Sequence, residues 1–165
     1  LNSQGFGYSL FDAEGIATAA TPLITDGVLN TLIHNSATAS FFDVATTGHA
    51  SRSPKSTMGV GLHQVEIAAG EATSTDLFAG KYLLLTDLTG LHSGANAISG
   101  NFSFGASGYL CQDGERIQPV RGITVAGNFY EMLGKISLIG KDQYWNWEKS
   151  ARMPHVRFAD IAISG

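Results

Sequence analysis

The strongest constraint on the fold is a run of alternating residues that ends at a turn signal. From Asn101 to Leu110, apolar residues such as Phe102 and Phe104 fall on even positions, and mostly small or polar residues fall on odd ones. A period of two residues is typical of a strand with one face in a core. Asp113-Gly114 then supplies a tight turn, because glycine adopts positive φ at no steric cost. The sequence therefore predicts an antiparallel hairpin that returns over Glu115 to Val120.

Similar short alternating segments recur along the chain and predict further strands. The expected strands are Phe6 to Phe11, Ile16 to Ala20, a hairpin from Thr21 to Ile33 that turns at Asp26-Gly27, His63 to Ala69, Lys81 to Leu88, Ile123 to Ala126, and Val156 to Ile163. Two segments rich in glycine, serine or threonine, Thr46 to Gly61 and Thr89 to Gly100, are expected to be loops, and Lys141 to Arg152 is expected to be irregular.

Capping residues predict a small number of short helices among these strands. Asn35-Ser36 can cap a helix over Ala37 to Phe42, and Ser74 can cap one helical turn. Asn128 is followed three residues later by Glu131, which is the capping-box spacing. Many strands with few helices indicate a mainly β (α+β) fold. We expect an antiparallel sheet or a closed β-barrel-like domain with two or three short helices.

Length and charge narrow the classes of protein that this chain can represent. Its 165 residues suit a single domain spanning 1–165, and the absence of an initiator methionine or signal peptide suggests a fragment of a longer chain. A formal net charge of −4 argues against a nucleic-acid partner. No apolar run approaches the length of a membrane span, so we expect no membrane partner and a cytoplasmic location.

The residue types that usually carry catalysis are present but poorly arranged. Cys111 is the only cysteine, nothing near it in sequence lowers its pKa, and we interpret it as a strand residue. Ser93 lacks the G-x-S-x-G elbow that exposes a nucleophilic serine. The five histidines include no pair at i, i+4 on a predicted helix, and the chain has no C-x-x-C pair. We therefore predict no catalytic residue and no metal ligand in this chain.

A segment near the C-terminus mixes basic and aromatic side chains. Its members are Lys141, Tyr144, Trp145, Trp147, Lys149, Arg152 and Arg157. Such a mixture can stack nucleobases, and it can also form a protein interface, where Trp, Tyr and Arg are enriched. The acidic net charge favours the interface.

Several segments, taken in order, resemble one family. The matching stretches are Phe11-Asp12-Ala13-Glu14-Gly15-Ile16-Ala17-Thr18 with Leu23 to Leu29, Asn35 to Ala39, Thr47-Gly48-His49-Ala50, Thr89 to Gly94 with Ile98 to Ser103, Gly105-Ala106-Ser107-Gly108-Tyr109 with Asp113-Gly114-Glu115, and Ile123 to Asn128 with Glu131-Met132-Leu133. Together they are similar to the runs "D-x-E-G-x-x-T", "S-Y-S-A", "T-G-x-A", "G-A-S-G" and "I-T-I-A-G-N-x-x-x-M-L" of TldD/PmbA proteins, also called modulators of DNA gyrase. The resemblance covers nearly the whole chain and identifies it with the C-terminal domain of that family.

The resemblance implies a peptidase. TldD-type members of this family carry an HExxxH zinc motif in an upstream domain and a third ligand, a cysteine, near the C-terminus. This chain has neither, and Cys111 does not match that ligand. The chain is therefore more similar to the metal-free PmbA (TldE) type, for which zinc is expected in a TldD-type partner. That heterodimer cleaves unfolded peptides and matures peptide precursors. No DNA-binding signal supports the older gyrase label.

Three hypotheses follow from these observations. The first is a PmbA/TldE-like C-terminal domain that contributes a subunit interface, with a TldD-type partner or by self-association, and part of a peptide channel. Its candidate substrate-binding residues are His92, Ser93, Gly94, Ser103 and Ser107. The second is a non-enzymatic β-rich interaction or scaffolding domain. The third is an independent hydrolase that uses Cys111 or Ser93.

Overall fold

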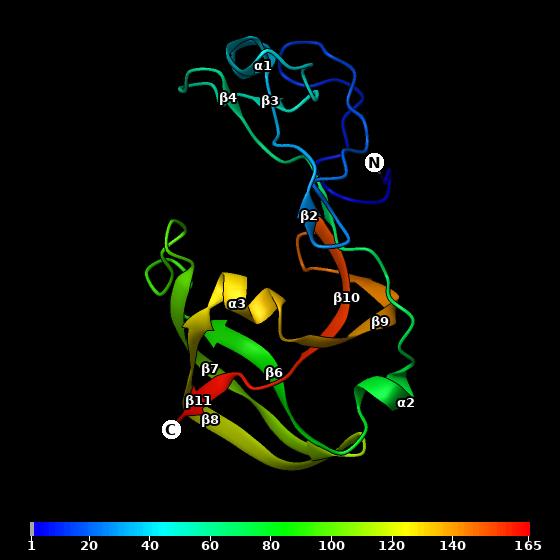
Figure 1. The fold of residues 1–165 in the computed structure, drawn as a ribbon, viewed down its shortest axis with the longest axis vertical. Coiled ribbons are helices and arrows are strands. Elements are labelled where there is room, and N and C mark those ends of the chain that lie inside the picture. The colour runs from blue at the N-terminus through cyan, green and yellow to red at the C-terminus, as the bar shows by residue number, and fades with distance from the viewer. Residues whose placement is uncertain (1) are drawn as a thin grey trace. The chain divides into compact units, whose positions relative to one another are not determined.

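The computed structural model describes residues 2–165 and contains two compact units (Figure 1). Unit 1 comprises Leu1–Ile67 and Trp145–Met153, and unit 2 comprises Ala68–Tyr144 and Pro154–Gly165. The chain passes from one unit to the other at residues 67–68, 144–145 and 153–154. Each unit is described separately below. The expectation of a single domain over residues 1–165 stays a prediction.

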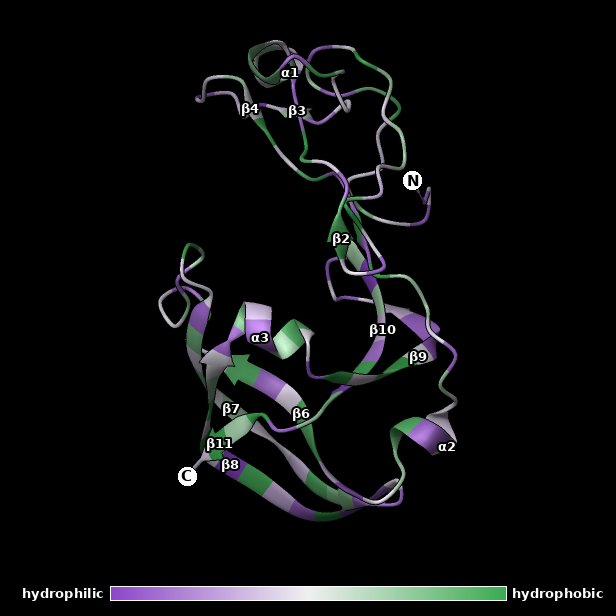
Figure 2. Ribbon diagram, in the orientation of Figure 1, coloured by the Kyte–Doolittle hydropathy of each residue, from purple (hydrophilic) through white to green (hydrophobic). Residues whose placement is uncertain are grey.

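The main sheet of unit 2 has four antiparallel strands in the order β11-β8-β7-β6. Its strands are β6 (Lys81–Thr89), β7 (Asn101–Gln112), β8 (Glu115–Asn128) and β11 (Ala162–Ser164). The hairpin predicted from the sequence is the centre of this sheet, and Asp113 and Gly114 form its turn with φ of 50° and 90°. The alternation of apolar and polar residues is visible along β8 in Figure 2. β8 is longer than expected, because it joins the two segments predicted as separate strands.

The core of unit 2 lies on one face of this sheet. Ala106 from β7 and Ile123 and Val125 from β8 are buried together. Leu83, Phe102, Val120 and Ile161 pack against them. Phe102 and Ala106, at even-numbered positions of β7, therefore face the core as predicted, because successive side chains of a strand alternate between its faces.

One backbone contact in this sheet requires a glycine. A Cβ atom on Gly108 would lie 1.9 Å from the backbone oxygen of Leu84 on β6. The pairing of β7 with β8 shifts register between Ala106 and Gly108, and again between Leu110 and Cys111. A bulge of this kind changes which face a residue occupies. Cys111 is consequently buried, with 1% of its surface exposed, although it falls on the odd-numbered positions that are otherwise mostly polar.

A second sheet has three strands in the order β5-β10-β9. They are β5 (Val65–Glu66), β9 (Ile136–Trp145) and β10 (Ala151–Phe158), and β5 pairs with β10 in parallel. The prediction that Lys141 to Arg152 is irregular is wrong at both ends, since only residues 146–150 lie outside strands. The strand predicted over Val156 to Ile163 is interrupted at Asp160, which has a φ of 52°.

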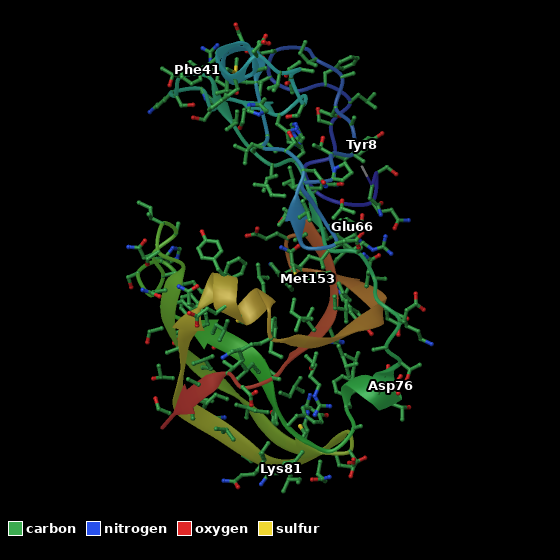
Figure 3. The ribbon with its side chains drawn as sticks, in the orientation of Figure 1. Tyr8, Phe41, Glu66, Asp76, Lys81 and Met153 are labelled. Carbon is green, nitrogen blue, oxygen red and sulfur yellow. The ribbon has the colours of Figure 1, made fainter. Side chains whose placement is uncertain are left out.

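Short elements complete the fold. The helices are α1 (Ser36–Phe42), α2 (Ser74–Leu77) and α3 (Phe129–Leu133), and the remaining strand pairs are β1 (Ile24–Thr25) with β2 (Val28–Leu29) and β3 (Ala50–Ser51) with β4 (Gly59–Val60). The predicted caps are confirmed at Asn35 and Asn128, whereas Thr73 rather than Ser74 caps α2. Figure 3 labels Asp76 on α2, whose carboxylate completes that cap.

The predicted fold class is confirmed in its main form, with mostly antiparallel sheets and three short helices. The closed barrel, the other architecture considered from the sequence, is not formed by any sheet within residues 2–165. No helix in this described part of the chain is long and apolar enough to cross a membrane.

Unit 1 is organised around polar groups. Its buried side chains are those of Asp12, His34, Asn35, Ala39, His49 and Ala50. Large apolar side chains lie mostly on its surface, and Phe41 on α1, labelled in Figure 3, is 82% exposed. Most of the buried side chains of unit 1 are therefore polar, and Asp12, His34, Asn35 and His49 are hydrogen-bonded.

Candidate functional site

The segment from Gly90 to Gly100, called here the 90–100 loop, folds tightly onto the start of β7. The backbone oxygen of Gly90 accepts hydrogen bonds from the N–H groups of Ser93 and Gly94, at 3.1 and 2.8 Å. The oxygen of Gly94 in turn accepts from the N–H of Ser103, at 2.7 Å. A Cβ on Gly94 would lie 2.4 Å from the Ser103 oxygen, so this close approach depends on glycine.

The other half of the loop is fastened to α3. Asn128 Nδ2 donates to Ser99 O at 2.8 Å and to Asn101 Oδ1 at 2.9 Å. Asn128 Oδ1 accepts from the backbone N–H groups of Tyr130 and Glu131 and so caps the helix. The hydroxyl of Tyr130 donates to Ala97 O at 3.2 Å. One asparagine thus joins the loop, the strand and the helix in a single arrangement.

The structure brings together four of the five predicted substrate-binding residues. His92 and Ser93 are exposed on the loop, Gly94 is half-buried, and Ser103 pairs directly with the loop backbone. Ser107 lies four residues farther along β7, opposite Asp87 of β6, and is half-buried. Binding of a substrate by these residues stays a prediction.

Sequence reasoning missed the apolar side chains that surround this loop. Leu91, Ile98, Phe129 and Tyr130 are all exposed, and Ile98 reaches 94% exposure. These four residues are called here the loop–α3 platform. The sequence feature that could have indicated this exposed apolar surface is the Phe129-Tyr130 pair directly after a helix cap. Aromatic residues at the start of a solvent-facing helix do not pack in a core.

No arrangement of nucleophile and base involves Cys111. Its thiol lies 3.6 Å from the backbone oxygen of Tyr109, to which it donates, and it is almost completely buried. Burial, followed by the hydrogen bond with Cys111, raises the pKa of the neighbouring Tyr82 hydroxyl. A thiol without access to solvent is a poor nucleophile and a poor metal ligand.

The part of the chain that the structure describes gathers no donor set for zinc. Within residues 2–165, no three His, Cys, Asp or Glu side chains come together as a metal site. His34, His49 and His63 are instead held by threonine or backbone oxygens. The residues present therefore do not fit the zinc that the family implies, and no chemical step is assigned to a metal here.

A polar network in unit 1 is centred on Asp12. Asp12 Oδ1 accepts from the N–H groups of Glu14 and Ile16, and Oδ2 accepts from Ala50, each at 2.9 Å. Burial alone would raise the pKa of this carboxyl, but the three backbone donors and the charge of His63 lower it below its usual value. Asp12 therefore holds two distant parts of unit 1 together as a carboxylate.

The middle of the aromatic and basic segment, residues 146–150, forms a turn in unit 1. Asn146 Oδ1 accepts from the N–H groups of Ser150 and Ala151, which fixes the turn. Trp147 at its tip is 99% exposed and lines an open cavity of about 530 Å³ with Phe6 and His63. In unit 2, Arg157 donates to the backbone oxygens of Leu77 and Ala79 and is thus engaged within that unit.

Comparison with known proteins gives consistent similarities. Residues 1–165 match the family model described as the PmbA/TldA metallopeptidase C-terminal domain. Metalloprotease PmbA of Escherichia coli O157:H7 is 34% identical over 142 residues, covering 84% of this chain and 29% of that protein. Metalloprotease PmbA homolog of Haemophilus influenzae is 31% identical over 135 residues, covering 80% of this chain and 28% of that protein.

Solved structures share the fold as well. TldE from Thermococcus kodakarensis superposes with a TM-score of 0.85 at 28% identity, over 95% of this chain and 36% of that one. A Thermotoga maritima structure, named for a suggested role as a modulator of DNA gyrase, gives a TM-score of 0.87 at 31% identity, over 99% of this chain and 37% of that one. The chain thus spans between 28% and 37% of the length of these relatives.

Proposed function

Because this chain belongs to the PmbA/TldA metallopeptidase family, in which it matches the C-terminal domain, we propose that it is the non-catalytic part of a peptidase assembly. In this proposal it is the C-terminal domain of a PmbA/TldE-like subunit in the cytoplasm. A TldD-type partner holds the zinc and breaks the peptide bond. The domain described here contributes surfaces that contact the partner subunit and the unfolded peptide. The similarity to TldE supports the subunit type.

The loop–α3 platform is the observation that carries this proposal. Its apolar side chains are exposed, yet the backbone beneath them is fixed by Asn128 and by the hydroxyl of Tyr130. An exposed apolar surface on a rigid backbone favours binding, because the protein loses little conformational entropy when a ligand binds to it. His92, Ser93 and Ser103 lie in the same region and supply polar groups for a peptide backbone.

The edge of the main sheet supports contact with an extended peptide. β6 is the last strand of that sheet, and among residues 2–165 it pairs only with β7. The free side of an edge strand presents N–H and C=O groups that can hold an extended chain whatever its sequence. Ser107 lies opposite Asp87 on this edge strand, next to the proposed peptide path.

Peptide cleavage by the reconstituted assembly tests the proposal. The chain, within its full-length subunit, is combined with a TldD-type partner, and turnover of an unfolded peptide is measured. The double substitution His92→Ala and Ser93→Ala, and separately Ile98→Ser, should reduce turnover about tenfold, the loss expected when a contact of about 1.4 kcal/mol is removed. Ile117→Ser is the matched control, because Ile117 is also an exposed isoleucine but lies on β8 away from the platform. Unchanged turnover in the platform variants would refute this function.

A second candidate function is a non-enzymatic interaction domain. The exposed Phe41 and Trp147 side chains favour it, because large aromatic residues anchor protein interfaces. A protein captured by this chain through Trp147, with no peptide cleavage in the presence of a TldD-type partner, would support this function over the first.

A further inference from the structure

A small cavity in unit 2 lies beside α3, and Asn128 is among the residues that line it. Its volume is about 200 Å³, below the range of about 300–1,000 Å³ that is usual for drug-sized ligands. It is called here the α3–β11 cavity, because it is lined by α3, by the end of β8 and by the residues that lead into β11. This volume suits a single amino-acid side chain with its adjacent backbone atoms.

The inner part of the α3–β11 cavity is apolar. Phe102, Met132 and Ile161 line it and are half-buried, and Phe102 and Ile161 also pack on the core of the main sheet. Gly127 keeps the space open, since a Cβ there would lie 3.3 Å from the Phe102 ring. The cavity is therefore an open extension of the core, which favours an apolar group as its occupant.

The outer part of the cavity carries charge. Glu131, Lys135 and Asp160 line it and are exposed. Lys135 Nζ donates to the backbone oxygen of Asp160 at 2.9 Å. The carboxylates of Glu131 and Asp160 have no hydrogen-bond partner among residues 2–165. Two carboxylates and one ammonium group leave this opening with a net negative charge, which favours a cation.

We propose that the α3–β11 cavity binds an apolar group that carries a primary ammonium, and that its natural occupant is the first residue of a peptide with a free N-terminus. The apolar side chain occupies the space between Phe102, Met132 and Ile161. The ammonium donates to the carboxylates of Glu131 and Asp160. The assignment to a peptide rests on the proposed function, whereas the preference for an apolar ammonium compound follows from the cavity alone.

Titration of the 165-residue chain followed by amide NMR shifts tests the cavity chemistry. The probe is L-leucinamide, which has both an ammonium and an apolar side chain, and it should shift the amides of Gly127, Met132 and Ile161. N-acetyl-L-leucinamide lacks the ammonium and glycinamide lacks the side chain. Each should bind at least about tenfold more weakly, which is the effect of losing about 1.4 kcal/mol. Equal binding of the acetylated probe, or shifts confined to another part of unit 2, would overturn the proposal.

Two variants sharpen the test. Glu131→Gln should weaken leucinamide binding about tenfold, since a charge-assisted hydrogen bond is replaced by a neutral one. Glu115→Gln is the matched control, because Glu115 is an exposed carboxylate at the far end of β8 and should change nothing. An equal effect of both variants would contradict the assignment. If Glu131→Gln fails to fold, the amide shifts that leucinamide and its two analogues cause in the wild-type chain still test the proposal.

The identity of the natural occupant is tested separately. A tetrapeptide that begins with leucine and has a free N-terminus should bind at least as tightly as leucinamide, and its N-acetyl form should not. If leucinamide binds and the tetrapeptide does not, the peptide assignment is wrong. The leucinamide titration is measured independently of peptide turnover by the reconstituted assembly, so failure of the proposed function at the loop–α3 platform and failure of the cavity assignment are distinguishable results.

Discussion

Replacing Asp12 should destabilise unit 1 more than its position in a short turn would suggest. In Asp12→Ala, three backbone N–H groups lose their acceptor. The donor of Ala50 is the most costly, because Ala50 is 1% exposed and water cannot readily replace the carboxylate. A buried unsatisfied donor costs about 1–3 kcal/mol and each partly exposed bond about 0.5–1.5 kcal/mol. The expected loss is therefore about 2–6 kcal/mol, a large fraction of the stability of a small unit.

Tryptophan fluorescence is the appropriate assay, because both tryptophans, Trp145 and Trp147, belong to unit 1. Urea unfolding followed by this signal should show a lower midpoint for Asp12→Ala and an intermediate one for Asp12→Asn, which keeps one acceptor oxygen. Asp26→Asn is the matched control, since Asp26 is exposed at a turn with a φ of 51° that asparagine also tolerates. Identical midpoints for Asp12→Asn and Asp26→Asn would refute the reasoning.

Acid provides an independent check on the same residue. The pKa of Asp12 is lower in the folded chain than its usual value, so its contribution to stability is fully present above the unfolded pKa of about 3.9. That contribution is lost as the pH falls through the lower, folded pKa. Asp12→Asn should therefore flatten the decrease of the urea midpoint in this acidic range. If the urea midpoints of the wild type and Asp12→Asn change with pH in the same way, the Asp12 carboxylate does not stabilise unit 1 as argued.

Three further predictions concern unit 2. Gly108→Ala should destabilise it by about 3 kcal/mol in thermal melts followed by circular dichroism, because the new methyl group meets the Leu84 backbone oxygen, whereas Gly134→Ala should have little effect. Asn128→Ala should cost about 1 kcal/mol and speed amide hydrogen exchange in residues 96–101, and unchanged exchange there would show that the loop does not depend on this cap. Cys111 should react with a thiol reagent only after urea unfolding, and rapid reaction of the folded chain would contradict its burial.

Local patterns in the sequence were sufficient for the parts of the fold that depend on neighbouring residues. The hairpin at Asp113-Gly114 and the cap at Asn128 each follow from a few adjacent side chains, and both are present. The family resemblance is confirmed by the match over residues 1–165. The segment Lys141 to Arg152 was missed because both faces of the strand there carry polar residues, so no period of two is visible.

The candidate site was only partly predictable, because it depends on contacts between distant residues. The loop from His92 to Gly94 was identified from its composition, but its attachment to Ser103 and α3 depends on pairing across many residues. The Asp12 network was also missed, since the sequence indicates a turn at Asp12 to Gly15 without showing that Ala50 completes it. The α3–β11 cavity combines residues from four elements, β7, β8, α3 and β11, so no single stretch of sequence predicts it.

The polar interior of unit 1 has a thermal consequence. Its large apolar side chains, such as Phe41, already contact solvent in the folded chain, so unfolding exposes little new apolar surface. Newly hydrated apolar area is what raises the heat capacity of an unfolding protein, and newly hydrated polar area lowers it. By itself, unit 1 should therefore unfold with a small heat-capacity increment, and its stability should vary only gently between cold and warm conditions. Unit 2, with its apolar core, should give a more sharply curved dependence on temperature.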